Sequence, residues 1–173
     1  MTQDTQEPKG LGGWLIVPAI GLFVLPFRLL TSLHSDFLPI FREGYWEILT
    51  TPGREAYHPL WAPLITFEVM GNALFVVFDL VLIYLFFTKS HRFPYLFIAF
   101  IVANVVFVVS DYFVAGLIPA VAAQKDTESI REMIRAVSTA IIWVPYFLVS
   151  QRVKNTFVRQ VSESHRTAAA RAN

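Results

Sequence analysis

Cysteine is absent from the 173-residue sequence, and charged residues make up only 16% of it. The lack of cysteine excludes disulfides, thiolate metal sites and cysteine nucleophiles. A soluble domain usually carries roughly a quarter charged residues, so the low charge and the hydrophobic content of 55% indicate an integral membrane protein. The histidines are scattered without the spacing of metal ligands, and we expect neither a metal nor another cofactor.

Catalytic motifs are also lacking. The sequence has no G-x-S-x-G, no H-E-x-x-H, no phosphate-binding glycine loop and no dinucleotide fingerprint. Asp79 and Asp111 do not form the G-x-G-D motif of an intramembrane protease. The basic residues near the C-terminus are too spread out to make a groove-sized patch for nucleic acid. We therefore predict that the protein is not an enzyme and has no nucleic-acid partner.

Four apolar runs are long enough to cross the roughly 30 Å hydrocarbon core of a bilayer as helices. They cover residues 10–33, 59–87, 95–119 and 130–149. The predicted fold is all-α, an integral-membrane four-helix bundle with up-down-up-down order. Residues 1–158 are expected to form this domain, and residues 159–173 a flexible cytoplasmic tail.

The connection between the first two spans, residues 34–58, has apolar content of its own. Proline and glycine interrupt it too often for a further span, at Pro39, Gly44, Pro52 and Gly53. Its large apolar residues recur near helical spacing, which favours a short amphipathic segment lying in the membrane interface. A loop folded over the helix ends is the alternative interpretation.

The second span carries three polar residues on one narrow face. At 100° per helical residue, Asn72 and Asp79 fall about 40° and about 20° from Glu68. The opposite face is composed of Val, Leu and Phe. We expect the apolar face to contact lipid and the polar face to contact the other helices.

The other spans supply polar residues at matching heights. At a rise of 1.5 Å per residue, Arg28, Glu68, Asp111 and Arg135 all lie about 7–9 Å from the membrane centre, on the outer side. Asn72 and Asn104 lie near the midplane, and Asp79 lies on the cytoplasmic side. An unpaired charge at such depth costs about 2.5–3.5 kcal/mol, so these groups are expected to pair.

Two interpretations of this polar cluster stay open. The favoured one is a buried network of Arg28, Glu68, Asp111 and Arg135 that fixes which helix faces which. The other is a polar cavity that binds a solute or passes protons toward Asp79. Asp79 itself either pairs with the basic residues beside the membrane, such as Lys89 and Arg92, or stays a protonated acid inside the bundle.

Two segments resemble a known family. These are G-G-W-L at positions 12–15 and W-V-P-Y-F-L-V-S-Q-R-V-K-N-T-F at positions 143–157. They are similar to small bacterial inner-membrane proteins grouped as domain of unknown function twenty-five sixty-nine, over residues 10–157. The resemblance implies a multi-pass, four-helix protein of the bacterial inner membrane, and it implies no activity.

The second of these segments has the composition of a membrane boundary. Trp143 and Tyr146 are aromatic anchors and Pro145 bends the helix, while Arg152 and Lys154 lie at the level of the lipid headgroups. An amphipathic helix over residues 150–157 would turn Val153 and Phe157 inward. A docking surface for a partner protein is the alternative.

For function, the sequence favours a non-catalytic accessory or scaffold subunit whose polar cluster sets the packing of helices. The alternative is a small oligomeric transporter or channel that uses its intramembrane carboxylates for protons or a solute. The expected partners are the lipid bilayer and either another membrane protein or further copies of the chain.

The orientation follows from the basic residues. The segments 1–9, 88–94 and 151–173 hold 8 of the 14 Lys and Arg residues and only three acids. Because basic flanks stay in the cytoplasm, both termini are predicted to be cytoplasmic. A reporter fused after Asn173 should be active only in its cytoplasmic form, and periplasmic activity would contradict this topology.

Overall fold

The computed structural model describes residues 10–123 and 127–157, and this part of the chain is helical without a strand. The long helices are α1, α4, α5 and α7, with shorter elements between and after them. In chain order the elements are η1 (Gly13–Leu15), α1 (Ile16–Ser32), η2 (Leu33–Phe37), α2 (Leu38–Arg42), α3 (Tyr45–Thr50), α4 (Trp61–Phe87), α5 (Phe93–Ala115), α6 (Pro119–Ala122), α7 (Thr127–Val149) and α8 (Gln151–Thr156). The predicted all-α fold is confirmed, while the predicted tail, residues 159–173, lies outside the described residues.

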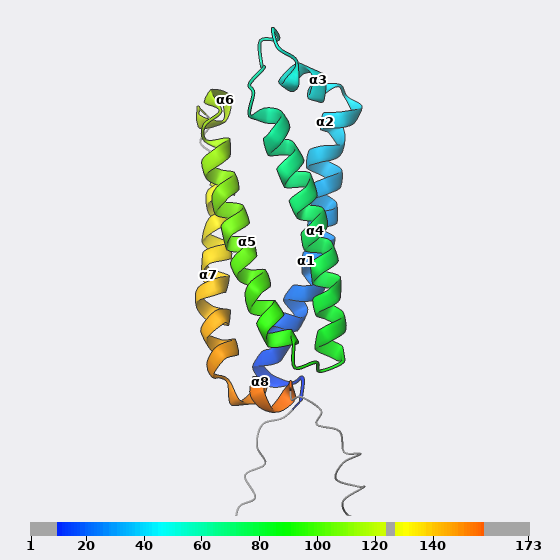
Figure 1. The fold of residues 1–173 in the computed structure, drawn as a ribbon, viewed down its shortest axis with the longest axis vertical. Coiled ribbons are helices and arrows are strands. Elements are labelled where there is room, and N and C mark those ends of the chain that lie inside the picture. Colours follow the sequence, from blue (N-terminus) through cyan, green and yellow to red (C-terminus); the bar gives the residue numbers. More distant parts are fainter. Residues whose placement is uncertain (1–9, 124–126, 158–173) are drawn as a thin grey trace, which may run out of the picture.

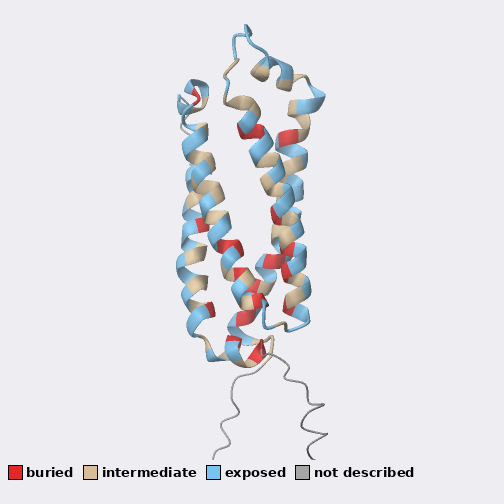
Figure 2. Cartoon of the chain, viewed as in Figure 1, coloured by how far each residue is buried: buried red, intermediate tan, exposed pale blue. Residues whose placement is uncertain are grey.

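Four helical segments are long and apolar enough to cross a membrane. They are Gly13–Arg42, Trp61–Phe87, Phe93–Ala115 and Thr127–Val149. Most of their length is exposed in the isolated chain (Figure 2), and large apolar side chains such as Leu74, Val106 and Ile141 point outward. So much apolar surface needs a cover of lipid, which indicates a protein embedded in a membrane.

The bundle consists of two helix pairs. α1 packs along α4, α7 packs along α5, and the pairs are joined where α4 packs on α5. The short turn between α4 and α5 lies at the same end of the bundle as α8, and α3 and α6 lie at the other end (Figure 1). The side of the bundle opposite the α4–α5 junction is therefore bordered by α1 and α7.

The first membrane helix is longer than predicted. The sequence interpretation ended it at Leu33, but the helix continues through a π-helical turn, η2, and through α2 to Arg42. Pro39 lies in the first turn of α2, where its missing N–H is tolerated. The chain turns only at Gly44, whose φ of 78° belongs to the left-handed region that glycine adopts easily. Within the connection predicted between the first two membrane helices, the structure has the short helix α3, while the part up to Arg42 belongs to the first helix. The location of α3 in the membrane interface stays a prediction.

Aromatic rings fill the core at the α8 end. Phe93 lies at the centre, with ring centroids 4.7 Å from Phe157 and 5.4 Å from Phe97. Phe97 in turn lies 4.6 Å from Phe147 of α7. Ring pairs at these distances add about 0.5–1.5 kcal/mol each beyond the burial of their area. This end of the bundle is therefore closed by packing.

One glycine sets the distance between the two helix pairs. A Cβ atom on Gly71 of α4 would lie 2.1 Å from ring atom Cε2 of Phe107 on α5. The Phe107 ring stacks on Phe67 at 4.7 Å and meets Phe75 edge-on at 5.3 Å. Small residues allow membrane helices to approach closely, and Gly71 is the position that admits the Phe107 ring.

We predict that Gly71→Ala destabilises the bundle by about 1–3 kcal/mol, because the added methyl group overlaps the Phe107 ring and forces α4 and α5 apart. The measurement is the midpoint of thermal unfolding of the purified protein in detergent. Gly21→Ala is the matched control, since Gly21 also lies within a membrane helix and has nothing within 4 Å of its Cβ position. Equal midpoints for the two variants would contradict the assigned role of Gly71.

Candidate functional site

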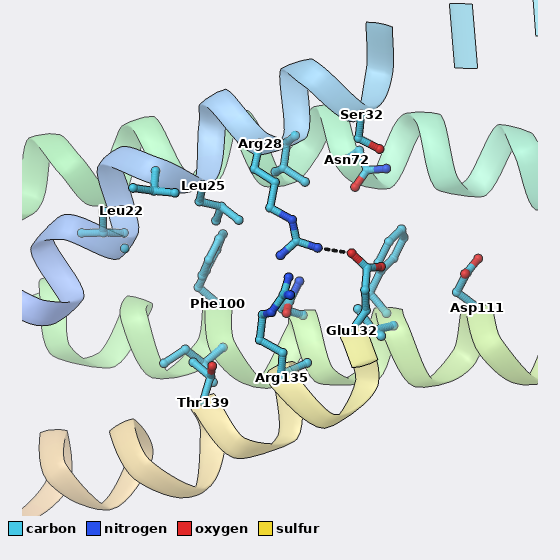
Figure 3. A pocket seen from close by; sticks show the side chains of 18 of the residues that line it. Leu22, Leu25, Arg28, Ser32, Asn72, Phe100, Asp111, Glu132, Arg135 and Thr139 are labelled. Atoms are coloured by element: carbon cyan, nitrogen blue, oxygen red, sulfur yellow. Dashed lines mark hydrogen bonds and ion pairs between the residues drawn. The ribbon is translucent and has the colours of Figure 1, made fainter. Parts of the chain in front are cut away.

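A cavity of about 640 Å³ lies between the two helix pairs. Its wall includes all six residues of the predicted polar cluster, contributed by α1, α4, α5 and α7: Arg28, Glu68, Asn72, Asn104, Asp111 and Arg135. Figure 3 shows four of them, Arg28, Asn72, Asp111 and Arg135. The structure therefore brings together side chains that are up to 107 positions apart in the sequence.

One ion pair crosses the cavity. The guanidinium group of Arg28 on α1 donates to the carboxylate of Glu132 on α7. The two side chains are 43% and 41% exposed, so the pair lies on the open side of the bundle. It links α1 to α7, whose main packing partners are α4 and α5 respectively.

Glu132 was not part of the predicted cluster. It lies at the start of the fourth predicted span, three residues before Arg135 and so one helical turn away from the predicted charged layer. A long arginine side chain reaches across that distance, so helix height alone did not identify the partner of Arg28. The spacing of Glu132 and Arg135 could have identified it, because residues three apart on a helix are neighbours on its surface. Glu132 therefore lies beside a member of the predicted cluster.

The carboxyl groups of Glu68 on α4 and Asp111 on α5 lie beside each other. Oδ1 of Asp111 is buried and has no hydrogen-bond partner among the described residues. Within the same part of the chain, Arg135 forms no ion pair with either acid. The four charges of the predicted network therefore share a cavity in the structure without neutralising one another in pairs.

A further acid stands at the wall of the cavity. Asp36 accepts hydrogen bonds from the hydroxyl groups of Ser32, at 2.6 Å, and Ser35, at 2.7 Å. Sequence reasoning missed it because the first span was ended at Leu33, which assigned Asp36 to a connection outside the membrane. The π-helical turn keeps it on the continuous first helix, where it lines the same cavity as Glu68.

The lining is ordered along the bundle axis. Figure 3 shows Leu22, Leu25 and Phe100 on one side of the two arginines, Arg28 and Arg135. Asp111 lies on the other side, with Glu132 between it and the arginines. The cavity therefore has an apolar part, a cationic level and an acidic part, in that order.

Asp79 lies outside this cavity. Its side chain is fully buried, and neither carboxyl oxygen has a hydrogen-bond partner within the described part of the chain. It forms no ion pair there with Lys89 or Arg92, so the structure does not contain the first of the two arrangements that the sequence left open. On α4, Asp79 is followed by the buried residues Leu82 and Phe86, and so belongs to the packed end of the bundle.

The two segments that carry the family resemblance meet at that end. The hydroxyl group of Thr156 accepts a hydrogen bond from the backbone N–H of Gly10 at 3.1 Å and donates to its carbonyl at 3.2 Å. The guanidinium group of Arg152 lies so close to Gly13 that a Cβ there would be 2.7 Å from it. The N-terminal segment and α8 therefore lock together across 146 positions of sequence.

The remaining boundary residues lie on α7 and α8. Trp143 and Tyr146 stack edge to face at 5.5 Å, next to Pro145 inside α7, and Lys154 is exposed on α8. Between the helices the chain bends at Ser150, whose hydroxyl group caps α8. Val153 and Phe157 are buried, which is the inward orientation that the sequence predicted.

Residues 8–158 match the model of a family described as protein of unknown function (DUF2569). The match includes both of the interlocked terminal segments and all the residues that line the cavity. No curated protein and no solved structure matches the chain.

We predict that reversing either charge of the Arg28–Glu132 pair, by Arg28→Glu or Glu132→Arg, lowers the thermal midpoint, because like charges then face each other. The double variant should recover the loss with a coupling of about 1 kcal/mol. Arg131→Glu on the exposed face of α7 is the control and should change stability by less than about 0.5 kcal/mol. Additive losses of stability in the double variant would show that the Arg28–Glu132 ion pair does not stabilise the bundle.

Proposed function

The chain belongs to the DUF2569 family of proteins of unknown function, as the resemblance predicted. We propose that it is a non-catalytic membrane protein that binds a small zwitterionic molecule between its helix pairs. This proposal develops the transporter alternative from the sequence rather than the scaffold interpretation. The observation that carries it is a cavity holding two arginines and a carboxyl pair that do not neutralise one another.

The charges support a ligand with both signs. Arg28 is already paired with Glu132, so Arg135 is the arginine available to an anionic group. Its planar guanidinium group suits a carboxylate or a phosphate. The neighbouring carboxyl groups of Glu68 and Asp111 suit a cation, which would complete charge-assisted hydrogen bonds to them.

The size of the cavity agrees with such a ligand. Sites for small molecules usually measure about 300–1,000 Å³ and combine apolar walls with a few polar groups. A network that served only to hold helices together would close on itself, because unpaired charges in an apolar bundle are costly. The space of about 640 Å³ instead leaves room for a molecule to supply the missing partners.

Binding would become transport if the site opened in turn to each side of the membrane. A carrier does this by moving one helix bundle against another around a fixed site. The two helix pairs, joined along α4 and α5, are the units that such a movement would use. Because four helices leave little room for a complete path, we include assembly of several copies in the proposal.

We predict that glycerophosphoethanolamine, a soluble zwitterion, raises the thermal midpoint of the purified protein more than ethanolamine or glycerol 3-phosphate at equal concentration. A ligand at 100 times its Kd stabilises by about 2.7 kcal/mol. Arg135→Gln and Asp111→Asn should each lose this shift, because each removes the partner of one charge.

Arg131→Gln is the matched control, since Arg131 lies on α7 and is 69% exposed beside Glu128. It should keep the full shift. Equal shifts from the zwitterion and from ethanolamine or glycerol 3-phosphate, or no shift at all, would contradict the proposed ligand.

The second candidate is an accessory subunit, and an apolar groove favours it. This groove measures about 1350 Å³ and runs along α4 and α5 past Met70, Leu74 and Val106. It could seat a transmembrane helix of another protein. The mass of the intact complex after gentle extraction distinguishes the candidates: a stoichiometric foreign partner favours the accessory subunit, and the chain alone or with its own copies favours the binding protein.

A further inference from the structure

The charged cavity is elongated along the first helix, and its apolar part forms a groove. Its lining on that helix runs from Val17 to Asp36. At 1.5 Å per residue, the apolar stretch from Val17 to Arg28 extends for about 16 Å. One leaflet of a bilayer has a hydrocarbon thickness of about 15 Å, half of the roughly 30 Å core. The apolar part of the groove is therefore as long as the acyl region of a lipid.

The groove lies on the open side of the bundle. α1 packs on α4 and α7 packs on α5, so the border between α1 and α7 lacks the close packing found at the α4–α5 junction. Val17 and Val24 line the groove and yet are 48% and 57% exposed. A molecule in the surrounding bilayer can therefore reach the groove sideways, past the exposed Arg28–Glu132 pair.

The chemical groups along this path have a definite order. From the apolar part, the first charges met are Arg28 and Arg135, followed by Glu132 and then Asp111 (Figure 3). A phospholipid that carries an amine has the same sequence of groups: acyl chains, then phosphate, then ammonium. Each group of the lipid would meet its complement, since arginine binds phosphate and carboxylates bind ammonium.

We propose that the zwitterion is the headgroup of a phospholipid with a primary ammonium group. The lipid enters between α1 and α7, and one of its acyl chains lies along the apolar part of the groove. This inference rests on the proposed function. The acids distinguish it from an anionic lipid: four carboxyl groups, from Asp36, Glu68, Asp111 and Glu132, line the cavity against two arginines.

Gly21 gives the apolar part its width. It lines the groove, and no atom lies within 4 Å of the position that its Cβ would take. A larger side chain at this position would fill the space of the acyl chain without touching the charged level, because Arg28 lies seven residues further along the helix. Gly21→Leu therefore separates binding of the acyl chain from binding of the headgroup.

The test uses the full chain reconstituted in nanodiscs of equal parts phosphatidylethanolamine, phosphatidylglycerol and phosphatidylcholine, followed by native mass spectrometry of the lipid retained. We expect phosphatidylethanolamine to be enriched about tenfold over the other two, which is the effect of one charge-assisted hydrogen bond. Arg135→Gln should reduce retention of all three lipids. Asp111→Asn should remove the preference for the ammonium group, and Arg131→Gln should behave as wild type.

Gly21→Leu should lose retained lipid and keep the thermal shift with glycerophosphoethanolamine. Preferential retention of phosphatidylglycerol, equal retention of all three lipids, or unchanged retention by Gly21→Leu would overturn the lipid inference. If glycerophosphoethanolamine shifts the midpoint while no lipid is enriched, only this inference fails. If neither binds, the proposed function fails as well.

Discussion

The close contact between Gly71 and Phe107 is the constraint on which the packing of α4 against α5 depends. In a bilayer, the lipid chains are as apolar as leucine, so burial of apolar surface does not drive helices together, and close packing of small residues against larger ones takes its place. The Phe107 ring fits against α4 only because Gly71 has no side chain. This fit joins the two helix pairs along one side and leaves α1 and α7 to border a space on the other. The cavity is therefore a consequence of where the close contact lies.

Asp79 and Asp111 have different surroundings in the bundle. At the α8 end, Asp79 is fully buried and has no hydrogen-bond partner among the residues described. In the cavity, Asp111 has a carboxyl neighbour, and both cationic side chains line the same space. Ionisable residues inside membranes usually mark a site or a path, and the surroundings of Asp111 offer a ligand room that those of Asp79 do not.

Much of the architecture could be predicted from the sequence, because length and apolar composition determine which segments can span a bilayer. The meeting of Arg28, Glu68, Asp111 and Arg135 could also be predicted, since charged residues in spans turn away from lipid. Helix height does not reveal how far a side chain reaches, and this hid the contact between Arg28 and Glu132. Nor does it reveal volume, so the sequence could not distinguish a closed network from a cavity.

Two other features were missed for local reasons. Pro39 suggested a break, but a π-helical turn before it let the first helix continue, and Asp36 joined the cavity as a result. Nothing in the sequence distinguishes Gly71 from the other residues of its apolar span, because its role depends on the Phe107 ring packed beside it. Both depend on a neighbour whose position only the folded chain provides. The family, by contrast, was accessible from two short segments of sequence alone.

The interlock between the N-terminal segment and α8 has a consequence for synthesis in the cell. Chains emerge from the ribosome with the N-terminus first, and domains fold as their parts become available. Gly10 and Arg152 belong to opposite ends of the described chain, so the glycines of the first segment wait for their partner until almost all of the protein has been made. Leu15, which is fully buried in the finished protein, belongs to the same core cluster as Val153 and Phe157, so that cluster is complete only at the end of synthesis. Completion of α8 is thus needed before this end of the bundle can close.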